Sequence, residues 1–311
     1  MDKNILCKSA MNNIPKIYAI IVTYNGLKWV DFCLGSLRHS NIPLTPLIID
    51  NCSTDETITY IKASYPEAII LEQTQNLGFG QANNVGFRFA LEHNADYVLL
   101  LNQDAAIAPD LIELCLEQSD STSLLSPIHM NGDGSQIDNN FRKNSLIKCE
   151  ALINDVFTNQ IKPSYVCGQV CAACWLLPIS IIRKIGGFNP LFFHYAEDDN
   201  FYHRLMFHNI NIRLVTQAKM FHDRKEFGNK LTYNKQWLAN ALLLISTNIN
   251  LTSKQRIAEY IKILIKCYVQ KLPLNQYRIG AYIYCMCKII TKYPKINKYR
   301  NLEKQVAPTF L

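Results

Sequence analysis

The sequence predicts an α/β protein with a mostly parallel central sheet flanked by helices. Short runs rich in β-branched and aromatic residues alternate with segments of helical spacing, which is the pattern of successive βαβ units. The run Tyr97–Leu101 is continuously apolar, as is typical of a strand buried on both faces of a sheet. Hydrophobic residues make up 49% of the 311 residues, which is ample for a large core.

The first half of the chain carries four predicted strands, at residues 16–24, 47–50, 68–71 and 97–102. Helical segments separate them, around residues 27–37, 56–64 and 76–93. Because parallel strands direct their carboxyl ends to one edge of the sheet, we expect the polar side chains at these ends to gather there. They are Thr23, Tyr24, Asp50, Asn51, Ser53, Asn76 and Asp104. Residues 1–15 are polar, and we expect a flexible N-terminus.

Asp104 carries most of the functional interpretation. It comes just after the buried strand, and a carboxylate there needs a cation, a hydrogen-bond donor or water. We interpret Asp104 as a ligand of a divalent metal on a nucleotide diphosphate. The alternative is a carboxylate that caps the next helix. Because that helix is predicted to begin near Pro109-Asp110, the sequence favours the metal ligand.

The segment after Asp104 is less regular. Strands are predicted at residues 124–127, 165–177 and 212–215, and residues 137–165 are expected to be irregular. The spacing of Cys167, Cys171 and Cys174 suits zinc poorly, and small cysteines packed in a buried strand explain them better. His222 is predicted at the exit of the last strand.

A cluster of carboxylates opens the helix predicted to end near His208. Glu197, Asp198 and Asp199 are adjacent, and the helix dipole alone favours acidic side chains at a helix N-terminus. Three carboxylates beside an aromatic cluster exceed what capping needs. One of them is therefore a candidate general base with a raised pKa.

Residues 233–311 form a predicted basic helical region. Residues 231–311 contain 13 Lys and Arg and two Glu, a net charge of +11, whereas residues 1–230 carry −4. A helix predicted at 254–271 has apolar positions at Ile257, Tyr260, Ile261, Leu264, Ile265 and Tyr268. A second apolar helix is predicted at 278–292, and Tyr293 and Pro294 are expected to end it. These helices either pack on the body of the protein or offer a basic surface to an anionic membrane, and both can hold.

The composition bears on the compartment of the protein. Eleven cysteines without paired spacing favour a reducing cytoplasm over a disulfide framework. The N-terminus lacks the apolar segment of a signal peptide, and no apolar run is long enough for a transmembrane helix. We therefore expect a cytoplasmic protein, with a location at the inner face of the cell membrane left open.

Five segments together resemble the family 2 inverting glycosyltransferases of the GT-A fold, particularly bacterial rhamnosyltransferase-like members. The segments are Ala19–Gly26, Ile48–Asp55, Asn76–Gly86, Leu99–Asp104 and Gly186–Arg204. The resemblance spans about residues 16–225. It implies a GT-A domain at residues 16–232, with a nucleotide-binding half at about 16–105 and an acceptor-binding half at about 106–232.

The resemblance also implies roles for the matching positions. Nucleotide-sugar binding is implied for Thr23, Tyr24, Asp50, Asn76, Gly78, Asn83, Asn102 and Gln103. Asp104 would hold Mg²⁺ or Mn²⁺, and His222 would complete that metal site. Asp198 would be the catalytic base, with the carboxyl group of Glu197 beside it.

The function implied by the resemblance is inverting transfer of a sugar, such as rhamnose or another deoxysugar, in bacterial surface polysaccharide synthesis. The donor would be a dTDP-sugar or UDP-sugar, and the acceptor a hydroxyl of a glycan or lipid-linked glycan. The main alternative is a non-catalytic nucleotide-sugar-binding or membrane-assembly subunit. Amides at Asn102 and Asn200, where the family often has acids, support that alternative.

Two other classes rank lower. A dinucleotide oxidoreductase is disfavoured because the G-x-G of Gly78-Phe-Gly80 follows the third predicted strand and position 83 is Asn. Nucleic-acid binding is disfavoured because the aromatic residues of the basic region lie mainly within apolar helices.

Overall fold

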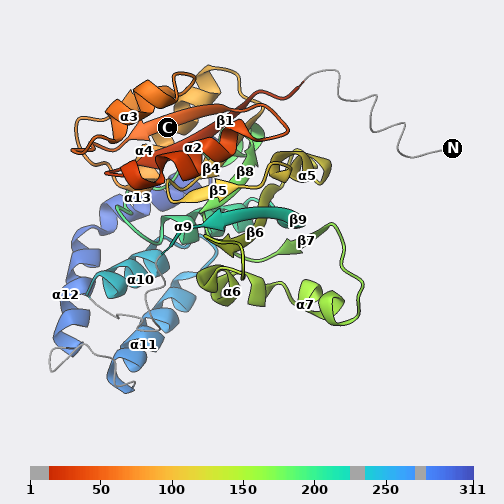
Figure 1. Cartoon of the computed structure of the whole chain (residues 1–311). Helices are drawn as coiled ribbons and strands as arrows, with labels where there is room; N and C mark the ends of the chain where they lie inside the picture. Colours follow the sequence, from red (N-terminus) through yellow and green to blue (C-terminus); the bar gives the residue numbers. More distant parts are fainter. Residues whose placement is uncertain (1–13, 225–234, 270–277) are drawn as a thin grey trace. The chain divides into compact units, whose positions relative to one another are not determined.

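The computed structural model describes residues 14–224, 235–269 and 278–311 (Figure 1), and these residues form two compact units. The first unit contains the described residues up to 76, residues 85–180 and residues 212–224. The second contains residues 77–84, residues 181–211 and the described residues from 235 onward. The domain boundaries expected near residues 105 and 232 stay predictions. The N-terminus expected to be flexible lies almost wholly outside the described residues.

The first unit is built on a nine-stranded sheet. Its strands are β1 (Ile17–Thr23), β2 (Thr45–Asp50), β3 (Ile69–Glu72), β4 (Tyr97–Leu101), β5 (Ala105–Ile107), β6 (Leu124–Asn131), β7 (Ser164–Cys167), β8 (Cys174–Pro178) and β9 (Ile212–His222). The strand order is β3-β2-β1-β4-β8-β6-β9-β5, and β7 pairs with β9. β1 to β4 are parallel as predicted, whereas β8 is antiparallel to β4 and β6. The predicted α/β class is confirmed, and the complete sheet is mixed.

Helices cover both faces of this sheet. α2 (Val30–Arg38) and α3 (Thr57–Ser64) pack on the face that receives Ile17, Ala19 and Ile21 of β1. The intervening Tyr18 points to the opposite face, where its ring meets Phe89 of α4 (Phe79–Glu92) at 5.4 Å. Successive side chains of a strand point to opposite faces, so β1 serves both layers. Two further elements of this unit are η1 (Leu27–Trp29) and α5 (Leu111–Glu117).

Two expectations for the later strands were wrong. Residues 137–165 are not irregular but contain α6 (Asn139–Asn144), η2 (Leu146–Lys148) and α7 (Glu150–Phe157). The Asp138 side chain caps α6 by accepting a hydrogen bond from the Phe141 amide at 2.8 Å, and the Phe141 side chain is buried. The single strand expected at residues 165–177 is divided into β7 and β8.

The second unit is helical. Its helices are α8 (Ile179–Ile185), α9 (Glu197–Phe207), α10 (Lys235–Thr247), α11 (Ser253–Val269), α12 (Arg278–Thr291) and α13 (Tyr293–Glu303). The first two residues of α8 belong to the first unit, and the rest of the helix belongs to the second. Leu238 and Leu242 of α10 pack with Tyr282 of α12 and Ile296 of α13 in one core. α12 ends at Thr291, just before Tyr293 and Pro294, as predicted, and Pro294 stands in the first turn of the next helix, α13, where a proline ring is tolerated.

The apolar stripe predicted on α11 is divided between two environments. Tyr260 and Leu264 pack against the helical core, but Ile257, Ile261 and Ile265 are 58%, 50% and 54% exposed. The side chain of the sixth predicted position, residue 268, lies outside the described residues. Among the helices that the structure describes, none has the length and apolar character needed to cross a membrane.

Candidate functional site

The carboxyl ends of β1 and β2 bring several predicted residues together. Thr23 is paired with Asp50 in the parallel register, and both side chains are buried. The Asp50 carboxylate accepts a hydrogen bond from the Ser53 amide at 3.1 Å. The Asn51 side chain donates to Asn76 Oδ1 at 3.0 Å, which connects the end of β2 to the segment before α4. The sheet edge therefore holds Thr23, Asp50 and Asn76 in one polar cluster.

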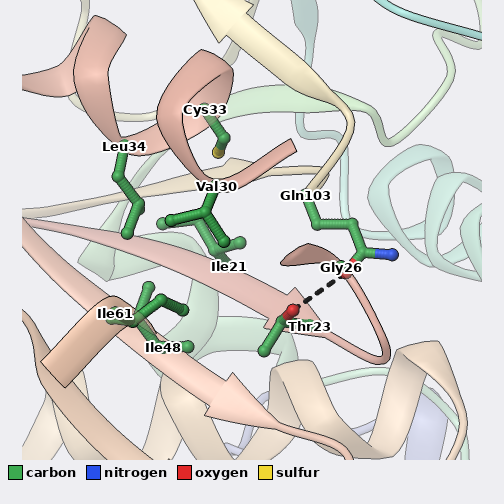
Figure 2. Close-up of a pocket in the computed structure, with 9 residues that line it drawn as sticks. All are labelled: Ile21, Thr23, Gly26, Val30, Cys33, Leu34, Ile48, Ile61 and Gln103. Carbon is green, nitrogen blue, oxygen red and sulfur yellow. Dashed lines mark hydrogen bonds between the residues drawn. The ribbon is translucent and has the colours of Figure 1, made fainter. Parts of the chain in front are cut away.

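The Gln103 side chain is hydrogen-bonded to the carboxyl end of β1. Its Oε1 atom accepts hydrogen bonds from the Thr23 hydroxyl at 2.9 Å and from the Tyr24 amide at 3.0 Å. Figure 2 shows the Thr23 bond at the polar end of a small pocket. The pocket is lined by Ile21, Thr23, Gly26, Val30, Cys33, Leu34, Ile48, Ile61 and Gln103. Gln103 thus fixes the strand end, while the Tyr24 ring stays exposed.

Asn25 is a residue of this edge that the sequence analysis missed. Its backbone is in the left-handed region, with φ at 49°, and its amide donates to Ser53 Oγ at 2.9 Å. Its side-chain oxygen accepts from the Thr54 amide at 2.8 Å. The signal was present in the sequence, since Asn tolerates the left-handed region and its side chain readily bonds to loop backbone.

Asp104 and His222 meet where β5 begins and β9 ends. His222 Nε2 donates to Asp104 Oδ1 at 3.1 Å, and the Asp223 amide donates to the Asp104 carbonyl at 2.8 Å. Burial acts to raise the pKa of Asp104, but the hydrogen bond from His222 and the nearby Arg224 charge outweigh it and hold that pKa below its ordinary value. Asp104 is therefore ionised at neutral pH.

A second carboxylate lies on the other side of the His222 ring. Asp138 Oδ2 is 4.0 Å from His222 Nδ1, too far for a hydrogen bond. Asp138 was not among the predicted site residues, because the segment around it was expected to be irregular. Asp138 thereby joins the cap of α6 to the surroundings of His222.

The donor atoms near Asp104 fit a divalent metal that keeps most of its ligands outside the protein. Within the described part of the chain, no three His, Cys, Asp or Glu side chains are placed to hold a metal ion together. Mg²⁺ and similar ions commonly take one or two protein ligands and complete their sphere with phosphate oxygens and water. Asp104 supplies an ionised carboxylate, and His222 would add an imidazole nitrogen that suits Mn²⁺ in the tautomer whose proton is on Nδ1, because the Nε2 atom that faces Asp104 then has a free lone pair. The Asn102 Oδ1 atom is buried and accepts no hydrogen bond from the described residues.

The predicted acidic segment lies in the second unit, and the two residues just before it have strained backbone conformations. Tyr195 and Ala196 have φ angles of 67° and 70°, in the left-handed region that side chains with a Cβ rarely adopt. Ala196 is the N-cap of α9 and offers no side-chain hydrogen bond to it. Strain of this kind persists where the surrounding structure enforces it, and it is concentrated at functional sites.

The two predicted catalytic carboxyl groups differ in environment. Glu197 is 6% exposed, and within the described residues its Oε2 atom has no hydrogen-bond partner. Burial, with the negative charges of Asp198 and Asp199, raises the pKa of Glu197 to about 8. Asp198 is only partly buried, and its Oδ1 atom accepts from the Asp199 amide at 2.9 Å. At neutral pH Glu197 therefore carries a proton beside Asp198.

The raised pKa of Glu197 predicts a pH-dependent stability. The folded state holds a proton that the unfolded chain releases near pH 4.5, so stability falls as pH rises from about 4.5 to about 8. Glu197→Gln removes this loss, and its advantage in stability should grow by roughly 1.4 kcal/mol per pH unit in that window. Melting temperatures at pH 5 and pH 8 measure it. Glu150→Gln, at the exposed first residue of α7, is the control. An equal advantage of Glu197→Gln at both pH values would contradict the prediction.

Gly78 and Asn83, predicted to lie along the nucleotide-sugar, have close packing partners in the second unit. Gly78 has φ at +77°, and a Cβ there would overlap the Phe193 carbonyl oxygen. The Asn83 side chain is buried and donates to the Phe79 carbonyl at 3.0 Å. At Gly80 a Cβ would lie 2.9 Å from that of Phe188. Packing thus explains this G-x-G pattern without a dinucleotide.

Comparison with known proteins identifies the family of the chain. Residues 18–186 match the model of Glycosyl transferase family 2. The chain is 28% identical over 184 residues to the low-salt glycan biosynthesis hexosyltransferase Agl10 of Haloferax volcanii, covering 57% of this chain and 58% of Agl10. It is 22% identical over 209 residues to the dTDP-rhamnosyl transferase RfbF of Shigella flexneri, covering 66% of this chain and 68% of RfbF.

Solved structures confirm the predicted GT-A fold. S. aureus TarS 1–349 in complex with UDP-GlcNAc aligns with a TM-score of 0.57 at 15% identity, over 93% of this chain and 90% of that one. The mannosyltransferase PcManGT from Pyrobaculum calidifontis, in complex with GDP-Man and Mn²⁺, aligns with a TM-score of 0.55 at 12% identity, over 94% and 85%. Because the family model covers more than half of its residues, the chain belongs to glycosyl transferase family 2.

Proposed function

We propose that this chain is an inverting glycosyltransferase that moves a sugar from a nucleoside-diphosphate sugar to a hydroxyl of a glycan or lipid-linked glycan, in bacterial surface polysaccharide synthesis. The observation that carries the proposal is the pair of Asp104 and His222, 3.1 Å apart at the strand ends of a family 2 chain. An ionised carboxylate beside an imidazole at the edge of an α/β sheet suits a metal-bound diphosphate.

The donor in this proposal is a dTDP-sugar or UDP-sugar, with rhamnose or another deoxysugar as the transferred group. The buried Asp50 carboxylate and Thr23 hydroxyl offer polar partners for a base or ribose. A relative, RfbF, is named a dTDP-rhamnosyl transferase, and the similar TarS structure holds UDP-GlcNAc. These names support the nucleotide-sugar class of the donor.

Asp104 and His222 would hold Mg²⁺ or Mn²⁺. When bound, the metal neutralises charge on the diphosphate leaving group. The lowered pKa of Asp104 keeps its carboxylate ready for a cation throughout the neutral range. Its side chain is 23% exposed, so water and a ligand can reach it, whereas His222 is fixed behind it at 1% exposure.

The acceptor chemistry is assigned to the start of α9. Asp198 takes the proton from the acceptor hydroxyl. The oxygen forms a bond to the anomeric carbon from the face opposite the diphosphate, the bond from that carbon to the diphosphate oxygen breaks, and the configuration inverts. Glu197 is protonated below about pH 8, so it adds no negative charge beside Asp198 at neutral pH.

A peripheral contact with an anionic membrane is part of the same proposal and would place the enzyme at the cytoplasmic face. The exposed side chains of Ile257, Ile261 and Ile265 recur every fourth residue along α11. Residues 235–266 carry five basic residues and a single acidic one. Exposed aliphatic groups on a basic helix suit the interface of an anionic bilayer.

A panel of thermal shifts tests the proposed donor site. We expect dTDP or UDP to raise the melting temperature in the presence of Mn²⁺, because a ligand of the folded state stabilises it by mass action. Asp104→Ala should abolish the metal-dependent part of the shift, whereas Asp110→Ala, at the N-cap of α5, should keep it. GDP and NAD complete the panel. A shift with NAD alone, or with no nucleoside diphosphate, would overturn the donor assignment.

A further inference from the structure

Residues 309–311 lie against the glycine turn that follows α8. Gly186 has φ at +73°, and a Cβ there would overlap the backbone of Thr309. At Gly187 a Cβ would lie 2.7 Å from the Leu311 side chain. A Cβ at Gly187 would also overlap the Asn84 side chain. Residues 309–311 therefore require a glycine at position 186 and add to the constraint on Gly187, although they lie more than 120 residues away in the sequence.

Hydrogen bonds tie Thr309 to both sides of this turn. The Gly187 amide donates to the Thr309 carbonyl at 2.9 Å, and the Thr309 hydroxyl donates to the Ile185 carbonyl at 3.1 Å. Arg204 of α9, whose side chain is buried, donates to Thr309 Oγ1 at 3.3 Å and to the Gly187 carbonyl. The turn, Thr309 and α9 thus share one network of hydrogen bonds.

Glu303, at the end of α13, makes a second set of contacts with α9 and with the segment that leads into it. Its side chain is 1% exposed and accepts from the Asn189 amide group at 2.7 Å. Its carbonyl accepts from His208 Nε2 at 2.8 Å, at the C-cap of α9. The Glu303 charge also acts on the buried Arg204 guanidinium, which lies 5.2 Å from the Phe310 ring.

Arg204 and the three acidic residues Glu197, Asp198 and Asp199 stand on the same helix. Arg204 donates its hydrogen bonds to the Gly187 carbonyl and to Thr309 Oγ1. The acidic residues stand in the first turn of α9, and Arg204 stands two turns further along. Arg204 therefore supports the acidic segment by fixing the helix that carries it.

We infer that residues 303–311 are a clamp that sets the position of α9, and that Thr309 and Glu303 are positioning residues for the carboxylate of Asp198. The inference rests on the proposed function for its catalytic consequence. The clamp acts through Arg204 and His208 on the helix, and through Gly187 on the segment that leads into it. Neither positioning residue is required to touch a substrate.

The first test compares Thr309→Val, which removes the hydroxyl and keeps the shape, with Thr309→Ser, which restores it. We expect Thr309→Val to speed amide hydrogen exchange at residues 185–208 and to leave residues 45–72 unchanged. Thr309→Ser should return the exchange to the wild-type rate. Thr291→Val is the matched control, because its hydroxyl donates to a helix carbonyl in α12 at 3.0 Å. Unchanged exchange at residues 185–208, or an equal effect of Thr291→Val, would overturn the clamp.

Steady-state kinetics separate positioning from simple loss of stability. Thr309→Val should lower kcat for sugar transfer by roughly ten- to a hundredfold with KM for the donor unchanged, because a small misplacement of a base is costly. If Thr309→Val does not fold, Glu303→Gln replaces it as the test variant. Glu303→Gln keeps the hydrogen bond from Asn189 and removes the charge near Arg204. An unchanged kcat in a variant with faster exchange would overturn the positioning role. If wild-type protein shows no transfer, the proposed function fails, and the exchange result still decides whether the clamp exists.

Discussion

Asp198→Asn is expected to lower kcat for sugar transfer by roughly 10²- to 10⁴-fold, the usual contribution of a general base. The amide keeps the size of the side chain and its capacity to accept a hydrogen bond from the Asp199 amide, but it cannot take a proton. Initial rates of nucleoside diphosphate release measure the effect. The thermal shift with donor nucleotide and Mn²⁺ should be unchanged, since the nucleotide site is assigned to other residues.

Asp199→Asn is the matched control, because the same exchange of carboxylate for amide occurs one residue further along the first turn of α9. We expect its kcat to stay within a few-fold of wild type. A kcat for Asp198→Asn close to that of wild type, with measurable wild-type turnover, would contradict the assignment of the base. Negligible turnover in both, across a broad range of donors and acceptors, would favour the non-catalytic nucleotide-sugar-binding subunit.

The triple variant Ile257→Glu/Ile261→Glu/Ile265→Glu is expected to lose binding to anionic vesicles. The three side chains are each about half exposed, so inserting them into a bilayer interface contributes about 3 kcal/mol, roughly a hundredfold in partitioning. The new carboxylates also oppose the anionic surface. Flotation with vesicles of phosphatidylglycerol and phosphatidylcholine measures the bound fraction, and pure phosphatidylcholine should bind less of the wild-type protein.

The matched control changes three exposed apolar residues on a single helix of the first unit, Ile153, Val156 and Phe157 of α7, to Glu. Wild-type flotation should persist in that variant. Equal flotation of the α11 triple variant and wild type would overturn the membrane surface. Light scattering covers a further outcome, in which the wild-type protein does not float with vesicles but is a dimer, and the α11 triple variant is a monomer. That result would assign the exposed isoleucines of α11 to contact with a second copy of the chain.

Local patterns in the sequence were enough to predict much of the first unit. Apolar runs of four to seven residues predicted β1 to β4, and each lies within a residue or two of its expected position. Strand order then brought Thr23, Asp50 and Asp104 to one edge, since parallel strands end together. The pair of Asp104 and His222 was also expected, although the resemblance to a family supplied that expectation, because 118 residues separate the two.

The sequence does not determine which partner a polar side chain takes in the folded chain. Gln103 was assigned to the nucleotide-sugar, yet the structure shows it bonded to Thr23 and Tyr24. Its role in donor binding stays a prediction. Residues 137–165 were expected to be irregular because of their polar composition, yet Phe141, Cys149 and Leu152 among them are buried, and the burial of Phe141 stabilises α6.

The sequence by itself determined the α/β class, the parallel first half of the sheet and the basic helical C-terminal region, because backbone hydrogen bonding and side-chain periodicity act between near neighbours. Only the tertiary structure decided which apolar residues of α11 are covered. Helical spacing shows which residues share one face of a helix, but it does not show what packs against that face. Only the tertiary structure raised the pKa of Glu197 and joined Thr309 to Gly187, because burial and contacts across more than 100 residues depend on the packed chain.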